Sequence, residues 1–452
     1  MIGFLRRLLK DRRGNALAIA CACMPLVIGA AGLATDTIEW TLWKRQLQRA
    51  ADSAAFAGVY DRASASGATT NTSTAVCRDL SVNLHTWMSL LATSPCSGTA
   101  GSYTTLSYPA DTAYVTNQVA VTLKVQQRLP FSSMFMSAPP VITASATAGS
   151  VTAGGNPCAL ALNKSGTAID NSGNATINAP TCIFYSDSAS SNSAAAGGSS
   201  VVTAKAIAGV GGIASSNNWV VNQYLPYSPS LPDPLASITP DPSDMHCAVS
   251  SSVRQGVTTY TPQALSDGMD ITTLRDASGN QANCFTSLSV GSNRTLSIPD
   301  SYTGPIYING GDVNLQGAFS CAACTIVLTN SSTATDATIG TWSTNAQATN
   351  NITAPTSGTY KGIAVYQDRR ATGNIDRING GSGNVISGVV YFPKDTLWIN
   401  GTGTATSLCS MFVANNIKFN GTSSIAISSA NDVSCSGANL PNGTITIVRL
   451  VA

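Results

Sequence analysis

The hydrophobic pattern begins with one long apolar run near the N-terminus. Residues 16–35 include no charged side chain, and Arg13 and Asp36 flank them. As a helix, this run rises about 30 Å, which matches the hydrocarbon core of a bilayer. Cleaved signal peptides carry a shorter apolar stretch of about 7–15 residues. The pattern therefore predicts a membrane-spanning helix over residues 14–35. Cleavage near Ala31, where small residues suit a signal peptidase, remains the alternative.

The charges around this run indicate its orientation. The tail over residues 1–13 is basic, and its cationic side chains are Arg6, Arg7, Lys10, Arg12 and Arg13. On the other side, the acidic residues Asp36 and Glu39 come first. Basic flanks of a membrane helix stay in the cytoplasm. We therefore expect a single-pass protein with a cytoplasmic tail and the rest of the chain on the opposite side.

The apolar pattern continues past the run with helical spacing. Over residues 36–62 we expect a helical stalk, in which apolar or small side chains recur at intervals of three and four: Trp40, Trp43, Leu47, Ala50, Ala54 and Ala57. Two interpretations of this helix-packing stripe stay open. It packs against a helix of a partner, or it packs on the next domain of the same chain.

Residues 63–154 predict a small α+β module. A helical pattern over 74–96 is ended by the Ser-Pro pair near its C-terminus. Partial alternation with many valines over 113–129 predicts a strand, and a second such stretch follows over 140–153. We therefore expect one helix followed by a pair of strands.

Residues 155–452 repeat short apolar segments and Asn-Gly turns. Asn-Gly follows an apolar residue or proline at five places: Asn309, Asn379, Asn400, Asn420 and Asn442. The last four are 21, 20 and 22 residues apart. A period near 21 suits one coil of a parallel β-helix, in which stacked Asn side chains bond between coils. A row of β-hairpins is the alternative, because Asn-Gly is also a hairpin turn. Prolines crowd residues 225–243, so we expect a semi-rigid excursion from a solenoid there.

Composition agrees with these elements. Hydrophobic residues make up 43% of the 452, and Ser, Thr, Asn and Gly fill much of the rest, which suits strands joined by tight turns. The predicted fold is mainly β, with an N-terminal transmembrane and stalk α-helix, a small α+β module and a C-terminal parallel β-helix-like solenoid. Only 10% of residues are charged and the formal net charge is +2, which argues against nucleic acid as a partner.

Twelve cysteines point to an oxidising compartment. Two of them, Cys21 and Cys23, lie in the apolar run, and the other ten are dispersed as in a disulfide framework. We expect neighbours to pair: Cys77 with Cys96, Cys158 with Cys182, Cys247 with Cys284, Cys321 with Cys324, and Cys409 with Cys435. Buried free thiols are the alternative.

Candidate catalytic and metal-binding residues are sparse. Cys321 and Cys324 form a lone CxxC, and the two histidines, His85 and His246, are distant in sequence, so we expect no metal site and no cofactor. Acids in the predicted coils are few: Asp312, Asp336, Asp368, Asp376, Asp395 and Asp432. Polysaccharide cleavage usually needs paired carboxylates. We expect no catalytic site, and an anchored polysaccharide-active enzyme remains a hypothesis to be tested at Asp312 or Asp376.

The N-terminal residues carry a family resemblance. Arg13-Gly14, the internal Pro25, the exit "GLATD" at 32–36 and "LQRAADSAA" at 47–55 resemble the N-terminal segment of TadG-like proteins of the tight-adherence (Flp) pilus assembly system. Related prepilins carry Glu five residues after the cleavage Gly, whereas residue 19 here is Ile. An uncleaved anchor fits this difference better than an assembled pilin does.

The resemblance implies a non-catalytic structural component of a Flp/Tad pilus assembly and secretion machine. Its anchor would lie in the bacterial inner membrane and its body in the periplasm. Its partners would be the membrane and other pilus-machine or pilin-like proteins. Association with further copies of the same chain is another alternative. The alternative is a minor pilin or adhesin that is displayed on the filament or cell surface.

Overall fold

The computed structural model describes residues 15–84, 94–95, 102–103, 105–152, 156–380, 384–401, 404–421, 424–428 and 446–451. The chain forms two compact units. The N-terminal unit comprises Met1–Thr152 together with Val448–Ala452, and the β-rich unit comprises Ala153–Ile447. Each unit is described by itself below.

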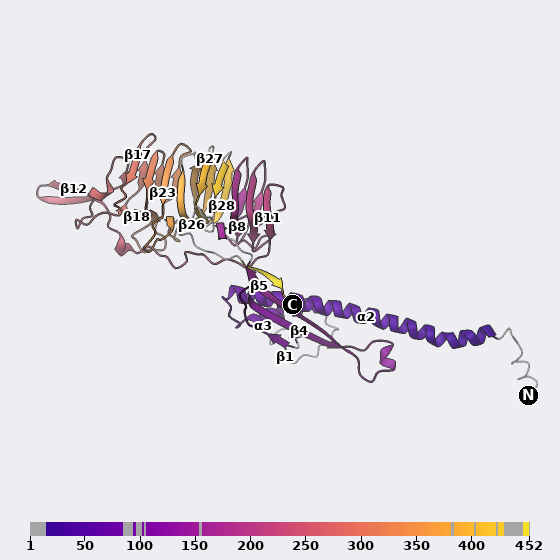
Figure 1. The fold of residues 1–452 in the computed structure, drawn as a ribbon. Coiled ribbons are helices and arrows are strands. Elements are labelled where there is room, and N and C mark those ends of the chain that lie inside the picture. Colours follow the sequence, from indigo (N-terminus) through magenta and orange to yellow (C-terminus); the bar gives the residue numbers. More distant parts are fainter. Residues whose placement is uncertain are drawn as a thin grey trace, which may run out of the picture. The chain divides into compact units, whose positions relative to one another are not determined.

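The N-terminal unit combines one long helix with a small antiparallel sheet (Figure 1). Its helices are α2 (Asn15–Ser64), α3 (Thr72–Asn83) and the short 3-10 helix η2 (Ser132–Met134). The strands are β1 (Ser94–Pro95), β2 (Ser102–Tyr103), β3 (Thr105–Ser107), β4 (Val115–Gln126), β5 (Val141–Thr152) and β30 (Thr446–Leu450). The sheet has the order β3-β4-β5-β30, and β1 pairs with β2.

The core of this unit follows from two periodicities. On β4, Val119, Val121, Leu123 and Val125 are buried at every second position, as expected for one face of a strand. On α2, Leu47, Ala51, Ala54 and other small residues are buried at intervals of three and four. Small side chains let the helix approach the sheet closely: a Cβ at Gly58 would lie 2.8 Å from Cγ1 of Val119.

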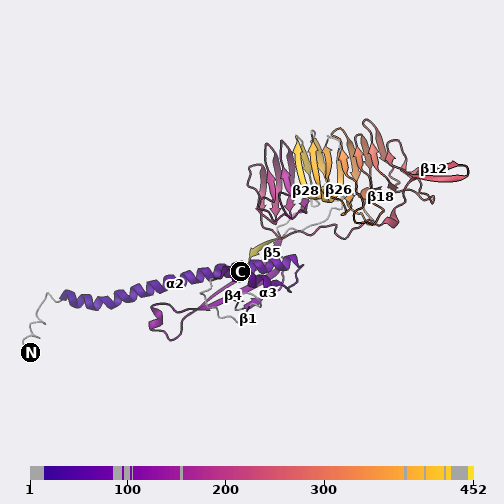
Figure 2. The same ribbon diagram turned by 180° about the vertical axis from the view of Figure 1, so that it is seen from behind.

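The β-rich unit is dominated by parallel strands (Figures 1 and 2). The first group is β6 (Asn156–Ala161), β7 (Ile169–Asn171), β8 (Thr176–Ser186), β9 (Ala194–Ala196), β10 (Val201–Gly209) and β11 (Trp219–Leu225). The 3-10 helix η3 (Pro242–Asp244) then precedes an antiparallel hairpin of β12 (Val249–Arg254) and β13 (Val257–Pro262). Strand β14 (Leu265–Ser266) and the 3-10 helix η4 (Ile271–Thr273) come next, and the second group of strands follows. It consists of β15 (Cys284–Phe285), β16 (Leu288–Val290), β17 (Thr295–Ile298), β18 (Gly304–Asn309), β19 (Val313–Leu315), β20 (Ala318–Cys321), β21 (Cys324–Thr329), β22 (Trp342–Thr344), β23 (Thr349–Thr353), β24 (Ile363–Gln367), β25 (Ile375–Gly380), β26 (Val385–Gly401), β27 (Thr404–Leu408), β28 (Ser410–Gly421) and β29 (Ser424–Ile427).

The strands of the β-rich unit do not stack in chain order. The chain begins in the middle of the stack and proceeds from β6 through β8 and β10 to β11. It then crosses to the opposite end, where β15 pairs with β18, and returns through β21, β24 and β26 to β28. Strand β28 finally pairs with β6, and β29 pairs with β8. In Figure 1 the yellow C-terminal strands therefore lie between the orange and the magenta ones.

The Asn-Gly positions align across these strands as the period near 21 predicts. In the parallel register, Asn379 pairs with Asn400 and Asn400 pairs with Asn420. Nδ2 of Asn400 donates to Oδ1 of Asn379 at 3.3 Å. The predicted Asn442 lies outside the described residues. The parallel register shows that these strands are not a row of hairpins.

Apolar side chains of the β-rich unit form two clusters. The first cluster is the larger buried core of the unit, and its aromatic members are almost completely buried: Phe184, Phe319, Trp342, Phe392 and Phe419. The other lies where the proline-rich segment, residues 226–245, covers the strands, and includes Tyr185, Tyr307, Tyr366 and Tyr391. We name this segment the strap. It joins β11 to the region of β12, which Figure 1 labels at opposite ends of the unit.

Three features differ from the sequence-based expectations. The helix expected over 74–96 already ends at Asn83, where Leu84 takes an extended conformation. Strand β30 joins the sheet of the N-terminal unit, although the segment to residue 452 was expected to be solenoid. The exposed hairpin β12–β13 was not expected, and its turn is formed by Gln255 and Gly256, which both have positive φ.

Candidate functional site

The first half of α2 exposes apolar side chains. Leu26, Val27 and Ile28 are among them, and Leu26 is 74% exposed. Within the described part of the chain, α2 is the one helix long and apolar enough to cross a membrane. Pro25 lies inside the helix without ending it. Exposure of such an apolar run to water is unfavourable, whereas its burial in the interior of a bilayer is favourable. This half of α2 is the candidate anchor.

The helix-packing stripe is divided along α2. Its members Leu47, Ala50 and Ala54 are buried in the core of the N-terminal unit, and Trp43 packs against that core. Ala57 is half-buried. Trp40, nearest the anchor, remains 41% exposed. The part of the stripe from Trp43 onward therefore packs on the chain's own core, which was one of the two interpretations. Trp40 is exposed to solvent at the edge of the candidate anchor.

The hairpin that joins β4 to β5 is tied to α2 at the end of the anchor. Both carboxylate oxygens of Asp36 accept hydrogen bonds from it, with the backbone N–H of Phe131 donating at 2.9 Å and that of Ser132 at 2.5 Å. The hydroxyl of Ser132 also donates to Asp36. One turn earlier, the Phe131 ring packs so closely on Gly32 that a Cβ there would overlap the ring. Asp36 and Gly32 together hold the hairpin against the helix.

Disulfides are present in the β-rich unit as three of the expected neighbour pairs. They join Cys158 to Cys182, Cys247 to Cys284 and Cys321 to Cys324. Cys77 and Cys409 are also disulfide-bonded, and their expected partners Cys96 and Cys435 lie outside the described residues. Cys21 and Cys23 on the candidate anchor are free thiols.

The strap is held by a row of tyrosines from successive strands. The hydroxyl of Tyr391 donates to Oδ2 of Asp233 at 2.6 Å, and the hydroxyl of Tyr366 donates to the carbonyl of Ile238 at 2.7 Å. The rings of Tyr366 and Tyr391 stack with centroids 5.0 Å apart. Burial raises the pKa of Tyr366 to about 12, so its phenol stays a hydrogen-bond donor at neutral pH.

Arg369 adds charge to the same contact. Its guanidinium lies 3.2 Å from Oδ2 of Asp233 and donates to the carbonyls of Leu235 and Ile238. The sequence analysis named Asp368 only among the acids of the predicted coils and did not predict a contact between Arg369 and the proline-rich segment. Nothing local records this contact, because more than 130 residues separate Arg369 from Asp233.

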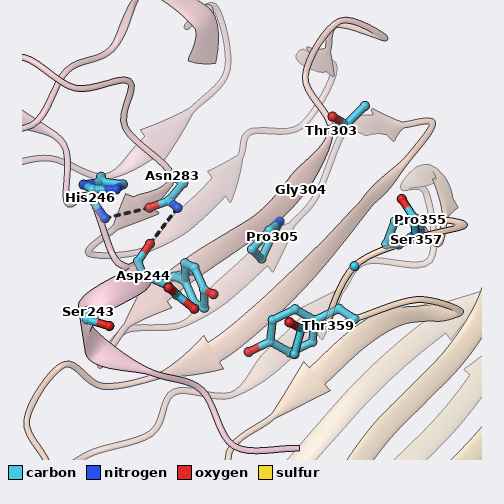
Figure 3. A pocket seen from close by; sticks show the side chains of 13 residues that line it. Ser243, Asp244, His246, Asn283, Thr303, Gly304, Pro305, Pro355, Ser357 and Thr359 are labelled. Carbon is cyan, nitrogen blue, oxygen red and sulfur yellow. Dashed lines mark hydrogen bonds between the residues drawn. The ribbon is translucent and has the colours of Figure 1, made fainter.

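A pocket of about 440 Å³ opens between the end of the strap and the strands (Figure 3). Ser243, Asp244, His246, Asn283, Tyr307 and Tyr360 are among the residues that line it. Oδ1 of Asn283 accepts from the backbone N–H of His246 at 2.7 Å, and its Nδ2 donates to the carbonyl of Asp244 at 2.9 Å. Asn283 therefore fixes the backbone at the end of the strap and at the residue that follows it. Nδ1 of the His246 ring lies 3.2 Å from Oδ2 of Asp276.

Asp312 and Asp376, the acids named for a test of polysaccharide cleavage, both accept hydrogen bonds from the protein backbone. Asp312 accepts from the backbone N–H of Thr341 at 2.7 Å. Asp376 is fully buried and accepts from the N–H of Trp342 at 2.6 Å. Burial raises the pKa of Asp376 to about 8, and the neighbouring Asp395 adds to the shift. Asp376 and Asp395 are both fully buried, so a polysaccharide cannot approach their carboxyl groups. Asp312 is exposed.

The match to a protein family lies in the N-terminal segment. Residues 14–66 match the family described as putative Flp pilus-assembly TadE/G-like, which confirms the resemblance found in the sequence. Among solved structures, the competence-associated pilin ComZ from Thermus thermophilus matches with 11% identity and a TM-score of 0.26, over 80% of this chain and 86% of that one. That TM-score is too low to support a conclusion on fold. No curated protein shows significant similarity to the chain.

Proposed function

We propose that this protein is a membrane-anchored, non-catalytic structural component of a Flp/Tad pilus assembly machine. The observation that carries the proposal is the match of residues 14–66 to the TadE/G-like family on the same helix that exposes its apolar half. The anchor covers residues 14–35, with the basic tail over 1–13 in the cytoplasm and the remaining chain in the periplasm.

The β-rich unit is proposed to be a parallel β-helix-like solenoid that acts as a scaffold or contact surface. Support comes from strands that pair in parallel about one coil apart, such as β18 with β21 and β26 with β28. The pairing of Asn379 with Asn400 and of Asn400 with Asn420 follows the same period. Disulfides across this unit suit an oxidising compartment such as the periplasm.

Trp40 is the proposed contact with other pilus components. It is the exposed end of the helix-packing stripe, and the rest of the stripe is already occupied by the chain's own sheet. A partner that carries a membrane helix of its own would share the bilayer with the proposed anchor. The edge of the anchor is therefore where a partner helix and α2 would meet, and a second copy of this chain is one such partner.

Fractionation of cells that carry a C-terminal epitope tests the anchoring. Full-length protein in the inner membrane, cleaved by added protease only after the outer envelope is opened, is the expected result. A Leu26→Lys, Ile28→Lys variant should leave the membrane fraction, because each lysine costs about 3 kcal/mol at the centre of a membrane helix. Ile38→Lys, beyond the run, is the matched control and should remain.

The intact mass of the same product separates the proposal from its alternative. A chain cut after Gly14 or near Ala31 and recovered with sheared filaments or in the medium would contradict an anchored machine component. That result would instead identify a minor pilin or adhesin displayed at the surface.

A further inference from the structure

The hairpin between β4 and β5 ends in an apolar tip. We name residues 129–136, "LPFSSMFM", the hairpin tip; they include η2. Met134 is 75% exposed and Phe135 is 74% exposed, and Met136 is also exposed. The ring of Phe135 lies 5.2 Å from that of Phe131, so the exposed apolar surface is continuous. Residues 127–140 contain no acidic side chain and one basic one, Arg128. Exposure of a continuous apolar patch to water is unfavourable, and such a patch marks a contact site.

The position of the tip on α2 indicates what covers it. Phe131 packs on Gly32, which lies inside the uncharged run that ends at residue 35. With a helix rise of 1.5 Å per residue, Gly32 lies roughly 5 Å inside the end of that run. Asp36 fixes the backbone of Phe131 and Ser132 at this height. The tip therefore sits beside the last turn of the anchor, level with the surface of any bilayer that the anchor crosses.

We propose that the hairpin tip inserts into the outer surface of the same bilayer and forms a second, interfacial membrane contact. The proposal rests on the proposed anchoring of α2. The occupant is the lipid bilayer, because the exposed side chains of Met134, Phe135 and Met136 are continuous through Phe131 with the membrane segment. Phe and other apolar side chains bind at this interfacial zone, and residues 127–140 contain no carboxylate whose desolvation would oppose entry.

The second membrane contact would fix the orientation of the N-terminal unit relative to the bilayer. Asp36 would otherwise bring a carboxylate to the edge of the hydrocarbon. Its hydrogen bonds to the tip satisfy that charge where water is scarce. With two contacts in the membrane, the N-terminal unit cannot rotate freely about the helix, so its sheet keeps one orientation toward the membrane plane.

Nitroxide labels on the full chain in phosphatidylcholine–phosphatidylglycerol vesicles test the proposal. Cys21→Ser and Cys23→Ser remove the free thiols. Single cysteines then carry the label at Ser133 on the tip, at Leu26 in the anchor and at Tyr114. Tyr114 is 81% exposed and precedes the opposite end of β4. The depth of each label follows from its collision rates with oxygen, which dissolves in lipid, and with a water-soluble nickel chelate.

The expected result is an oxygen-to-nickel ratio at Ser133 several-fold above that at Tyr114, with the highest ratio at Leu26. In the Met134→Ser, Phe135→Ser variant, the ratio at Ser133 should fall to that of Tyr114, while Leu26 keeps its value. A lipid-exposed Leu26 with a water-exposed Ser133 in the parent chain would overturn this inference alone. A water-exposed Leu26 would overturn the proposed anchoring and the tip contact with it.

Discussion

The two compact units bury apolar surface in different ways. The N-terminal unit packs one helix on one face of a small antiparallel sheet, and its core consists of alanine, valine and leucine side chains. The β-rich unit instead encloses large aromatic residues between its strands and covers a second cluster with the strap. Small core residues allow the close helix contact but bury less area for each residue.

The difference also concerns what completes each unit. The β-rich unit is closed by its own chain, because β28 and β29 return to β6 and β8 and the strap covers the outer tyrosines. The N-terminal unit leaves the first half of α2 and the hairpin tip exposed. Exposed apolar surface of this kind marks a contact site, and the proposed membrane anchoring would cover it.

The largest expected effect lies at the closure of the β-rich unit. Phe419 on β28 is fully buried and meets Phe184 of β8 edge-on, with ring centroids 5.9 Å apart. Phe419→Ala should lower the free energy of unfolding of this unit by about 3–5 kcal/mol. Chemical denaturation in detergent, followed by the tyrosine signal, measures it. Val253→Ala on the exposed hairpin is the control and should change little. Equal effects of the two variants would show that the return of β28 does not stabilise the unit.

A corresponding cavity in the N-terminal unit should cost somewhat less and act separately. Leu47→Ala removes a fully buried side chain from the contact of α2 with the sheet. We expect a loss of about 3 kcal/mol in that unit. Hydrogen exchange of β4 and of β26 distinguishes the two units, and exchange should accelerate in β4 only. Equal acceleration in both strands would contradict independent cores.

The buried carboxyl pair predicts a pH effect that only the β-rich unit should show. The pKa of Asp376 rises from 3.8 to about 8 because burial removes water from the carboxyl group. Between these values the folded state holds a proton that the unfolded state releases. Stability should therefore fall as pH rises, by up to about 1.4 kcal/mol per pH unit. Denaturation midpoints from pH 5 to 8 measure the slope.

The variant Asp376→Asn should abolish this slope. An amide can still accept from the N–H of Trp342, and its NH₂ group replaces the proton shared with Asp395. The same slope in the parent and in the variant would assign the pH dependence to another group.

The smallest effect is expected at the strap. Tyr391→Phe removes the hydrogen bond to Asp233 and keeps the buried ring, which should cost about 1–2 kcal/mol. Limited proteolysis should cut residues 226–245 faster in this variant. Tyr224→Phe, whose hydroxyl makes only long contacts, is the matched control and should leave the rate unchanged. Unchanged cleavage in Tyr391→Phe would mean that apolar packing alone holds the strap.

Much of the fold could be predicted because burial leaves a local periodic signal. The alternation over 113–129 corresponds to β4, and the three-and-four spacing corresponds to the buried face of α2. The Asn-Gly period predicted the register of Asn379, Asn400 and Asn420. The end of α3 was misplaced because the apolar pattern continues past Asn83, where the backbone becomes extended.

The sequence by itself determined the long apolar helix, the alternation of β4 and three neighbouring cysteine pairs of the β-rich unit, because each depends on residues close together in the chain. Only the tertiary structure decided that β28 returns to β6, that Asp233 meets Arg369 and Tyr391, and that Phe131 meets Gly32. These contacts join segments about 100 to 250 residues apart. They depend on which surfaces fit one another in space, and no local period records that fit.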